Sequence, residues 1–203
     1  GALPLVSPAR QAILALQPDS DAMRAKLHQK WRNRLKHGEK AGLQVRHHPL
    51  PWRSDHWLLQ ADTAQQRARG YSNWPVPLTL GFAATTPRAA ILFEAFQGAD
   101  PVAALLILRH GTTATYHIGH TTTAGRAASA HTLLMWTAMR WCADHGHDWL
   151  DLGLVETQRN AGLARFKLGT GADVVPLGGT WVHWSPLRPL RRLTWLDRKA
   201  MIP

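Results

Sequence analysis

The chain has 203 residues, of which 45% are hydrophobic and 18% are charged. This composition is typical of a folded globular protein and excludes an intrinsically disordered one. The length is enough for one well-packed domain or for two small ones with thin cores. Cys142 is the only cysteine, which excludes a disulfide framework and a thiolate zinc site. No apolar stretch approaches the length of a membrane span.

The formal net charge is +11, and the basic residues gather in two clusters. The first lies between Arg24 and Arg53, where Glu39 is the only acid. The second closes the chain and sets five basic residues against one acid: Arg188, Arg191, Arg192, Arg198 and Lys199 against Asp197. Two clusters favour a polyanionic partner, such as RNA, a phosphorylated substrate, a cofactor pyrophosphate or an anionic membrane, over a solvated basic face. We therefore predict a cytoplasmic protein, with peripheral contact to the inner membrane face as a variant of this prediction.

The first part of the chain is predicted to hold two strands and two helices. Apolar runs followed by turn residues indicate strands at 11–17 and 43–46. A helix is expected from Ser20 through Lys40, ended by Gly42, and another over 57–69, ended by Gly70. The first of these helices has a thin apolar stripe, and the rest of its surface is basic.

From residue 89 onward the predicted elements are mainly strands. Apolar segments separated by Gly-containing turns predict an antiparallel meander at 90–96, 102–109 and 112–118. A helix over 125–145, a strand over 149–154, a helix over 161–168 and a strand over 180–184 follow. This order is typical of a single α+β domain over residues 1–203. Within it we distinguish a basic N-terminal helix at 20–41, a core at 88–185 and a basic tail at 186–203.

The junction between the predicted strand at 112–118 and the next helix is rich in Gly and Thr. Such a turn directs backbone N–H groups toward one point, where the helix dipole also favours an anion. The segment resembles the Gln/Arg-x-x-Gly-x-Gly/Ala loop that cradles the coenzyme A pyrophosphate in GNAT acetyltransferases, with Thr122 in place of Gln or Arg. That resemblance implies a donor-binding role for Thr122, Thr123, Gly125, Arg126 and Ala127. An ordinary helix entry is the alternative.

The stretch from His145 to Ala172 carries a second, more specific pattern. Its strand contains Gly146, Trp149, Asp151 and Gly153, and then come Gly162, Leu163, Phe166, Lys167, Gly169 and Gly171. With the basic segments Lys30-Trp31-Arg32-Asn33 and Glu39-Lys40-Ala41-Gly42-Leu43, this pattern resembles the Fem-type aminoacyltransferases of the GNAT superfamily from about Gln11 to Trp184. The resemblance implies a single GNAT-like domain with a mostly antiparallel sheet flanked by helices, and an acyltransferase activity. Two-domain members share the acceptor site between domains, so the acceptor side is left unassigned here.

The resemblance also implies roles for single residues. Attack of an amine on an ester builds negative charge on the carbonyl oxygen, which Lys167 would stabilise; a solvated or phosphate-neutralising Lys167 is the alternative. Asp151 is a candidate base or ion-pair partner, or else a strand-end cap, and Glu156 is a second candidate base. The remaining candidates are Arg165 and Phe166 for the donor, and Trp31, Arg32 and His120 for the substrate.

The twelve histidines show no metal-binding spacing, so we predict no metal site. His47, His48, His145 and His147 are expected in turns. Cys142 falls on the apolar stripe of a helix and is predicted to be core.

Three functions are compatible with these patterns. The first is transfer of an aminoacyl group from aminoacyl-tRNA to an amine of a peptidoglycan precursor or a peptide-like metabolite. The second keeps the fold and uses acyl-coenzyme A as the donor. The third is a non-catalytic RNA-binding module, although no motif with stacking aromatics is recognisable. In each case no tightly bound cofactor is expected.

Overall fold

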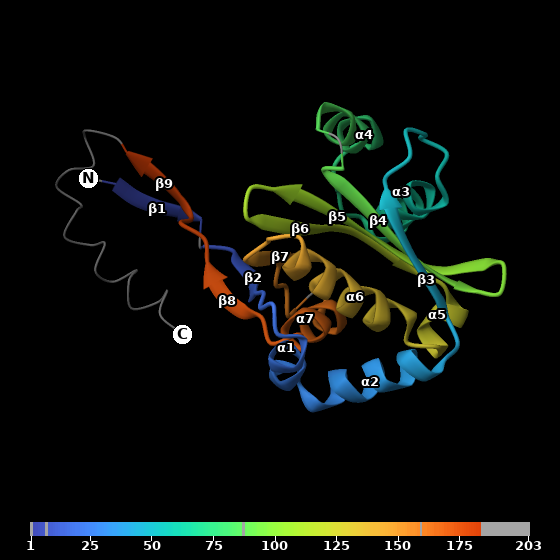
Figure 1. Cartoon of the computed structure of the whole chain (residues 1–203). Helices are drawn as coiled ribbons and strands as arrows, with labels where there is room; N and C mark the ends of the chain where they lie inside the picture. Colours follow the sequence, from blue (N-terminus) through green and yellow to red (C-terminus); the bar gives the residue numbers. More distant parts are fainter. Residues whose placement is uncertain (1, 7, 87, 159, 184–203) are drawn as a thin grey trace.

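The fold is built on a sheet whose strands follow the order β3-β4-β5-β6-β7-β2-β8 (Figure 1). The computed structural model describes residues 2–6, 8–86, 88–158 and 160–183. The strands are β2 (Arg10–Ala15), β3 (Gln44–Pro49), β4 (Ala90–Gln97), β5 (Asp100–His110), β6 (Thr113–Thr121), β7 (Trp149–Leu154) and β8 (Asp173–Pro176). Neighbouring strands are antiparallel except for β6 and β7, which are parallel. A separate ribbon pairs β1 (Ala2–Val6) with β9 (Thr180–His183).

Strands β4, β5 and β6 form the predicted antiparallel meander. Tight turns join them, and Gly98 and Gly111 take positive φ values of 63° and 58° there, which glycine adopts without a steric penalty. Strand β6 contains a bulge, because Leu106 pairs with Ile118 and Ile107 with Tyr116, so that His117 is the extra residue. The bulge places Tyr116 on the side of one core cluster and Ile118 on the side of the other.

The parallel pair β6–β7 is short. The two strands are paired only from Thr113 opposite Trp149 to Thr115 opposite Asp151. Strand β6 then continues to Thr121 and β7 to Leu154 without pairing to each other. The carboxyl ends of the two strands therefore diverge, and such crevices are where open α/β sheets bind ligands.

Helices cover both faces of the sheet (Figure 1). One face packs against α1 (Ser20–Lys26), α2 (Gln29–Lys40) and α6 (Ala130–Asp144), and the larger core cluster lies there. The other face packs against α3 (Trp57–Arg69) and α4 (Val76–Thr85) over a smaller cluster. The short helices α5 (Thr123–Ala127) and α7 (Ala161–Leu168) follow β6 and β7. Phe166 and Leu168 of α7 pack against the larger cluster.

Two predicted helices are each divided in the structure. The helix expected from Ser20 to Lys40 breaks at Leu27, which is extended and 2% exposed, and the backbone N–H of His28 donates to the Gly169 carbonyl at 2.9 Å. The burial of Leu27 and the hydrogen bond from His28 to the end of α7 therefore interrupt the helix between Lys26 and Gln29. The helix expected over 125–145 breaks into α5 and α6 at Ser129, whose φ is 54°.

The α+β class and the mostly antiparallel sheet flanked by helices are confirmed. Helix α4 was not predicted, because its sequence VPLTLGFAAT contains Pro and Gly and has little helical periodicity. Strands β1 and β8 were also missed. The placement of His47 and His48 in a turn is wrong, since both lie on β3. The basic tail at 186–203 and Trp184 lie outside the described residues. None of the helices in the described part of the chain combines the length and hydrophobicity of a bilayer crossing.

Candidate functional site

The side chain of Lys167 is buried and reaches the carboxyl end of β7. Lys167 lies on α7, its side chain is 6% exposed, and Nζ donates to the carbonyl oxygen of Leu154 at 2.8 Å. An ammonium has three N–H donors, and this is the one hydrogen bond that Nζ makes within the described residues. Burial lowers the pKa of Lys167, and the negative charges of Asp151 and Glu156 oppose this shift. The three predicted catalytic residues are therefore brought together.

Asp151 shapes the strand end that receives Lys167. Its Oδ1 accepts a hydrogen bond from the backbone N–H of Gly153 at 2.7 Å, and its Oδ2 accepts one from Gln11 Nε2 on β2 at 2.5 Å. Gly153 has a φ of 77°, and a Cβ at that position would lie 3.5 Å from Lys167 Nζ. Among the described residues Asp151 forms no ion pair with Lys167 or Arg165. The strand-end cap is thus the role that its contacts fit.

An open pocket of about 290 Å³ lies directly after β7. It is lined by Val155, Glu156, Thr157 and Gln158, the loop between Leu154 and α7. Glu156 is exposed in this pocket. Gly162 lies in the first turn of α7, and a Cβ added there would have no described atom within 4 Å. The loop therefore offers a solvent-open approach beside the strand end that holds Lys167.

Two residues that sequence analysis did not single out lie next to the last β6–β7 pair. Tyr116 on β6 and His131 in the first turn of α6 are hydrogen-bonded, with the hydroxyl oxygen 3.0 Å from Nε2. A Cβ on Gly119 would overlap that hydroxyl, so only glycine fits there. The His131 ring lies 5.2 Å from the ring of Phe166, the neighbour of Lys167. Burial lowers the pKa of His131 to about 4, so this ring is neutral at physiological pH.

The predicted substrate residues on α2 link that helix to α7. Trp31 is 4% exposed, its ring centroid lies 6.0 Å from that of Phe166, and a Cβ on Gly169 would lie 2.6 Å from its Cδ1. Arg32 donates to the Ala25 carbonyl at 2.9 Å. Trp31 is thus a packing residue behind the site, and the prediction that these side chains contact substrate stays a prediction. Arg165 is exposed and donates to the Ala161 carbonyl of its own helix.

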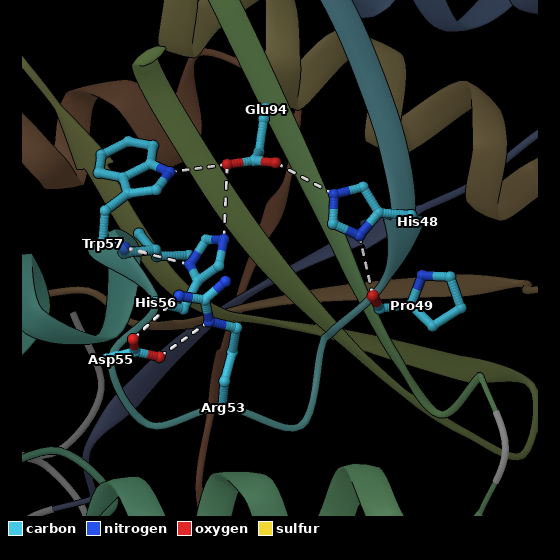
Figure 2. Close-up of polar contacts among 8 residues, drawn as sticks. His48, Pro49, Arg53, Asp55, His56, Trp57 and Glu94 are labelled. Carbon is cyan, nitrogen blue, oxygen red and sulfur yellow. Dashed lines mark hydrogen bonds and ion pairs between the residues drawn. The ribbon is translucent and has the colours of Figure 1, made fainter.

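A polar cluster on the opposite face of the sheet is centred on Glu94 of β4. Figure 2 shows its carboxylate between Trp57 and His48. Trp57 Nε1 donates to Oε1 at 2.7 Å, His48 Nε2 lies 3.1 Å from Oε2, and His56 Nε2 lies 3.7 Å from Oε1. Glu94 is 6% exposed, so these partners compensate a buried carboxylate. His48 Nδ1 also donates to the Pro49 carbonyl at 2.9 Å.

The hydrogen bonds of the His56 ring fix which of its nitrogens carries the proton. His56 Nδ1 accepts from the Leu58 N–H at 3.3 Å, so the proton of the neutral ring sits on Nε2, facing Glu94. Burial lowers the pKa of His56, in keeping with a neutral ring. The His56 nitrogen that faces Glu94 then offers no lone pair to a cation. Across the described chain no group of three or more His, Cys, Asp and Glu side chains could hold a metal ion.

Comparison with known families fits this geometry. Residues 23–168 match a family model described as an acetyltransferase (GNAT) domain. The chain belongs to this GNAT family. The prediction of an acyltransferase domain is therefore confirmed at the level of the family. No curated protein matches the chain.

Solved structures of the GNAT fold extend the comparison. FemX is similar over 92% of this chain and 64% of its own, with a TM-score of 0.72 at 12% identity. L-PGS from Bacillus licheniformis is similar over 98% of this chain and 67% of its own, with a TM-score of 0.55 at 12% identity. A candidate lysylphosphatidylglycerol synthetase from Agrobacterium fabrum contributes a C-terminal domain with a TM-score of 0.56 at 13% identity, over 87% of this chain and 59% of its own. The chain thus spans 64%, 67% and 59% of these three chains, in the order given.

The GNAT-type turn after β6 is occupied by its own side chains. Thr122 Oγ1 donates to the Val102 carbonyl at 3.1 Å and accepts the Gly125 N–H at 3.1 Å. A Cβ on Gly125 would overlap the Val102 oxygen. Arg126 donates to the Thr121 carbonyl, and Thr123 and Ala127 are exposed. The small residue at 125 is thus required by packing against β5, and a pyrophosphate-binding role of the turn stays a prediction.

Proposed function

We propose that this GNAT domain is an N-acyltransferase that moves an aminoacyl group from aminoacyl-tRNA to an amine. The observation that carries the proposal is the buried Lys167 ammonium beside an open pocket at the diverging strand ends. A fixed cation in a poorly solvated position stabilises a developing oxyanion far better than one in water. Its two remaining N–H donors supply that interaction.

In the proposed reaction the nitrogen of the acceptor amine attacks the ester carbonyl carbon. A C–N bond forms, the carbonyl oxygen becomes an oxyanion near Lys167, and the C–O bond to the tRNA ribose then breaks. The amine loses a proton and the ribose hydroxyl gains one. Asp151 is engaged by Gly153 and Gln11, so Glu156, exposed in the pocket, is the better placed proton acceptor.

The basic face of α2 supports tRNA as the donor. Lys30, Arg34, Lys36 and Lys40 are exposed on this helix. Its one acid, Glu39, is already paired with Arg24 by two hydrogen bonds of 2.7 Å, so the net positive charge of the face is left to attract phosphates. Trp31 joins the same helix to α7 and thereby to Lys167. A polyanion on α2 would therefore lie next to the proposed site.

The structural neighbours favour the same class of substrate. Lysylphosphatidylglycerol, in the name of one neighbour, is an aminoacylated lipid. For this chain we propose an amine of a peptidoglycan precursor or of a peptide-like metabolite as the acceptor. The protein would act in the cytoplasm, free or in peripheral contact with the inner membrane face.

Acyl-coenzyme A is the second candidate donor, because the matching family is described as an acetyltransferase domain. Against it, the Gly125 N–H that would bind a phosphate is already held by Thr122. The two donors separate in one experiment. We expect aminoacyl-tRNA to bind with a steep salt dependence and to yield an N-acylated product with Nα-acetyl-lysinamide, while coenzyme A leaves the melting temperature unchanged. Stabilisation by coenzyme A without tRNA binding would reverse the assignment.

A matched pair of variants tests the docking surface. Removing two charges from α2 with Arg34→Gln and Lys36→Gln is expected to weaken tRNA binding and to reduce the salt slope by about 2, since each phosphate contact contributes about one unit. The control, Arg67→Gln with Arg140→Gln, removes two exposed charges from other helices. Equal effects of both pairs would mean that only net charge matters. Binding of tRNA without any product would favour an RNA-binding module.

A further inference from the structure

Charged and titratable side chains are rarely buried without a partner of opposite charge. Among the acidic and basic side chains, the described residues bury four: Asp62, Glu94, His147 and Lys167. Glu94 receives hydrogen bonds from Trp57 and His48, and the charge of Lys167 faces Asp151 and Glu156. His147 Nε2 accepts from Arg109 at 2.9 Å. Asp62 differs from Glu94, because its hydrogen-bond partners are all neutral and it forms no ion pair within the described residues.

The contacts of Asp62 come from its own helix and the following loop. Its side chain is 7% exposed on α3. Gln66 Nε2 donates to Oδ2 at 2.7 Å, while Asn73 Nδ2 donates to Oδ2 and the Tyr71 hydroxyl to Oδ1 at 3.4 Å each. Contacts of 3.4 Å are at the long limit of a hydrogen bond. Oδ1 therefore has only one weak donor within the described chain, and no ion pair with Asp62 forms there.

The surroundings of Asp62 suit a cation. Trp74, 41% exposed, packs its ring 4.8 Å from His117 on β6, and Tyr71 is 40% exposed beside it in the same loop. Aromatic faces attract ammonium groups. Burial lowers the pKa of His117 to about 4, so that ring carries no competing charge at neutral pH. Arg69 is exposed and its charge reaches Tyr71, but it forms no ion pair with Asp62 in the described structure.

Asp62 also lies near β6, because α3 packs against that strand. Its negative charge acts on Tyr116, His117 and His120, three residues of β6 beyond the last pair with β7. His120 Nδ1 is buried without a hydrogen-bond partner among the described residues, and an unpaired buried nitrogen indicates that a further polar group belongs there. Strand β6 thus separates Tyr116, which contacts His131 of α6, from His117, which contacts Thr79 of α4, and from Asp62 on α3.

We propose that the Asp62 carboxylate recognises a primary ammonium group of a substrate, held at Oδ1 beside the exposed Tyr71 ring. The inference rests on the proposed acyl transfer, and it assigns the α3 face to the amine-bearing part of a substrate. Two sources share this chemistry. One is the α-ammonium of the aminoacyl group, and the other is the ammonium form of the acceptor before it loses its proton.

Two small probes distinguish these sources without any transfer reaction. L-alaninamide carries only an α-ammonium, and Nα-acetyl-L-lysinamide carries only a side-chain ammonium. Nα-acetyl-L-alaninamide is the neutral control. Binding is followed by chemical-shift changes of the backbone amides, with Asp62→Asn as the test variant. Asp144→Asn, which removes an exposed carboxylate at the end of α6, is the matched control.

We expect saturable binding of at least one ammonium probe, with the largest shifts at Asp62, Tyr71 and Asn73. Asp62→Asn should raise its Kd at least tenfold, and Asp144→Asn should leave the Kd within twofold. The probe that binds shows which of the two ammonium groups this site recognises. Equal binding of the neutral control, or chemical-shift changes centred elsewhere in the protein, would overturn the proposal. Both results are measured on the unmodified protein, so they hold even if Asp62→Asn does not fold. Failure of acyl transfer would refute the proposed function and leave these binding results standing.

Discussion

Replacing Lys167 by Met separates the chemical role of the ammonium from its structural role. Met has nearly the length and volume of the Lys side chain and fills the same space without charge. The change removes one hydrogen bond of 2.8 Å to the Leu154 carbonyl, which is worth about 1–2 kcal/mol of stability. It also removes the cost of burying a charged residue that is 6% exposed. Because these two effects oppose each other, we expect the free energy of unfolding to change by no more than about 2 kcal/mol.

The effect on the reaction should be much larger. Losing an oxyanion donor costs about 2–4 kcal/mol of transition-state stabilisation, which corresponds to a decrease in kcat of about 30- to 900-fold. The assay is single-turnover transfer from aminoacyl-tRNA to Nα-acetyl-lysinamide, with urea unfolding measured on the same samples. Arg140→Met, which removes an exposed cation from α6, is the control. A Lys167→Met protein that is folded and keeps full turnover would refute the reasoning.

The pH dependence of stability gives an independent check on the burial of Lys167. Its pKa is lowered in the folded state by burial, so between that value and the unfolded value near 10.5 the unfolded chain binds more protons. The stability conferred by this residue therefore rises as the pH rises through that window. We expect the free energy of unfolding of the unmodified protein to rise, relative to that of Lys167→Met, from pH 7 to pH 10.5. An unchanged difference would mean that the ammonium is solvated.

Three further outcomes test the packing. Gly125→Ala should lower the free energy of unfolding in urea by about 3 kcal/mol or more, because its Cβ would overlap a backbone oxygen. Gly162→Ala, in open space on α7, should leave the free energy of unfolding unchanged or raise it by about 0.5–1 kcal/mol. Glu94→Leu should lower the free energy of unfolding by about 2–4 kcal/mol, because it leaves the Trp57 N–H and His48 unpaired. Glu94→Gln should lower the free energy of unfolding by less, and equal losses in the two variants would argue against a stabilising role of these hydrogen bonds. Burial raises the pKa of Cys142 to about 12, so its labelling by a disulfide reagent at pH 8 should proceed at the unfolding rate, and rapid labelling would contradict its burial.

Periodic and turn signals were enough to predict most of the sheet. The segments 90–96, 102–109 and 149–154 match β4, β5 and β7 closely, because apolar runs between Gly-containing turns have few other solutions. Helices α3 and α7 were predicted with the bounds that they have. The breaks at Leu27 and Ser129 could not be predicted, since they depend on docking against α7 and α2, which are far away in the sequence.

The site was predicted less completely than the fold. A motif resemblance singled out Lys167, Asp151 and Glu156, and the structure brings these three together. Asp62 and His131 lie in no motif, and their interest comes from burial and partners that only a three-dimensional arrangement reveals. One signal was present in the sequence: Asp62 stands on an otherwise apolar and amide-rich helix face, before a loop with Tyr71 and Trp74.

The bulge at His117 has a consequence for how this strand can vary. Downstream of the bulge, Gly119 lies under the Tyr116 hydroxyl and His120 lies against the Trp57 ring on the other face. Deleting the one extra residue would exchange these two faces for the rest of the strand, because side chains alternate with a period of two. An imidazole would then occupy the space in which even a methyl group does not fit. Among homologous chains, β6 should therefore tolerate substitutions far more readily than any change in its length.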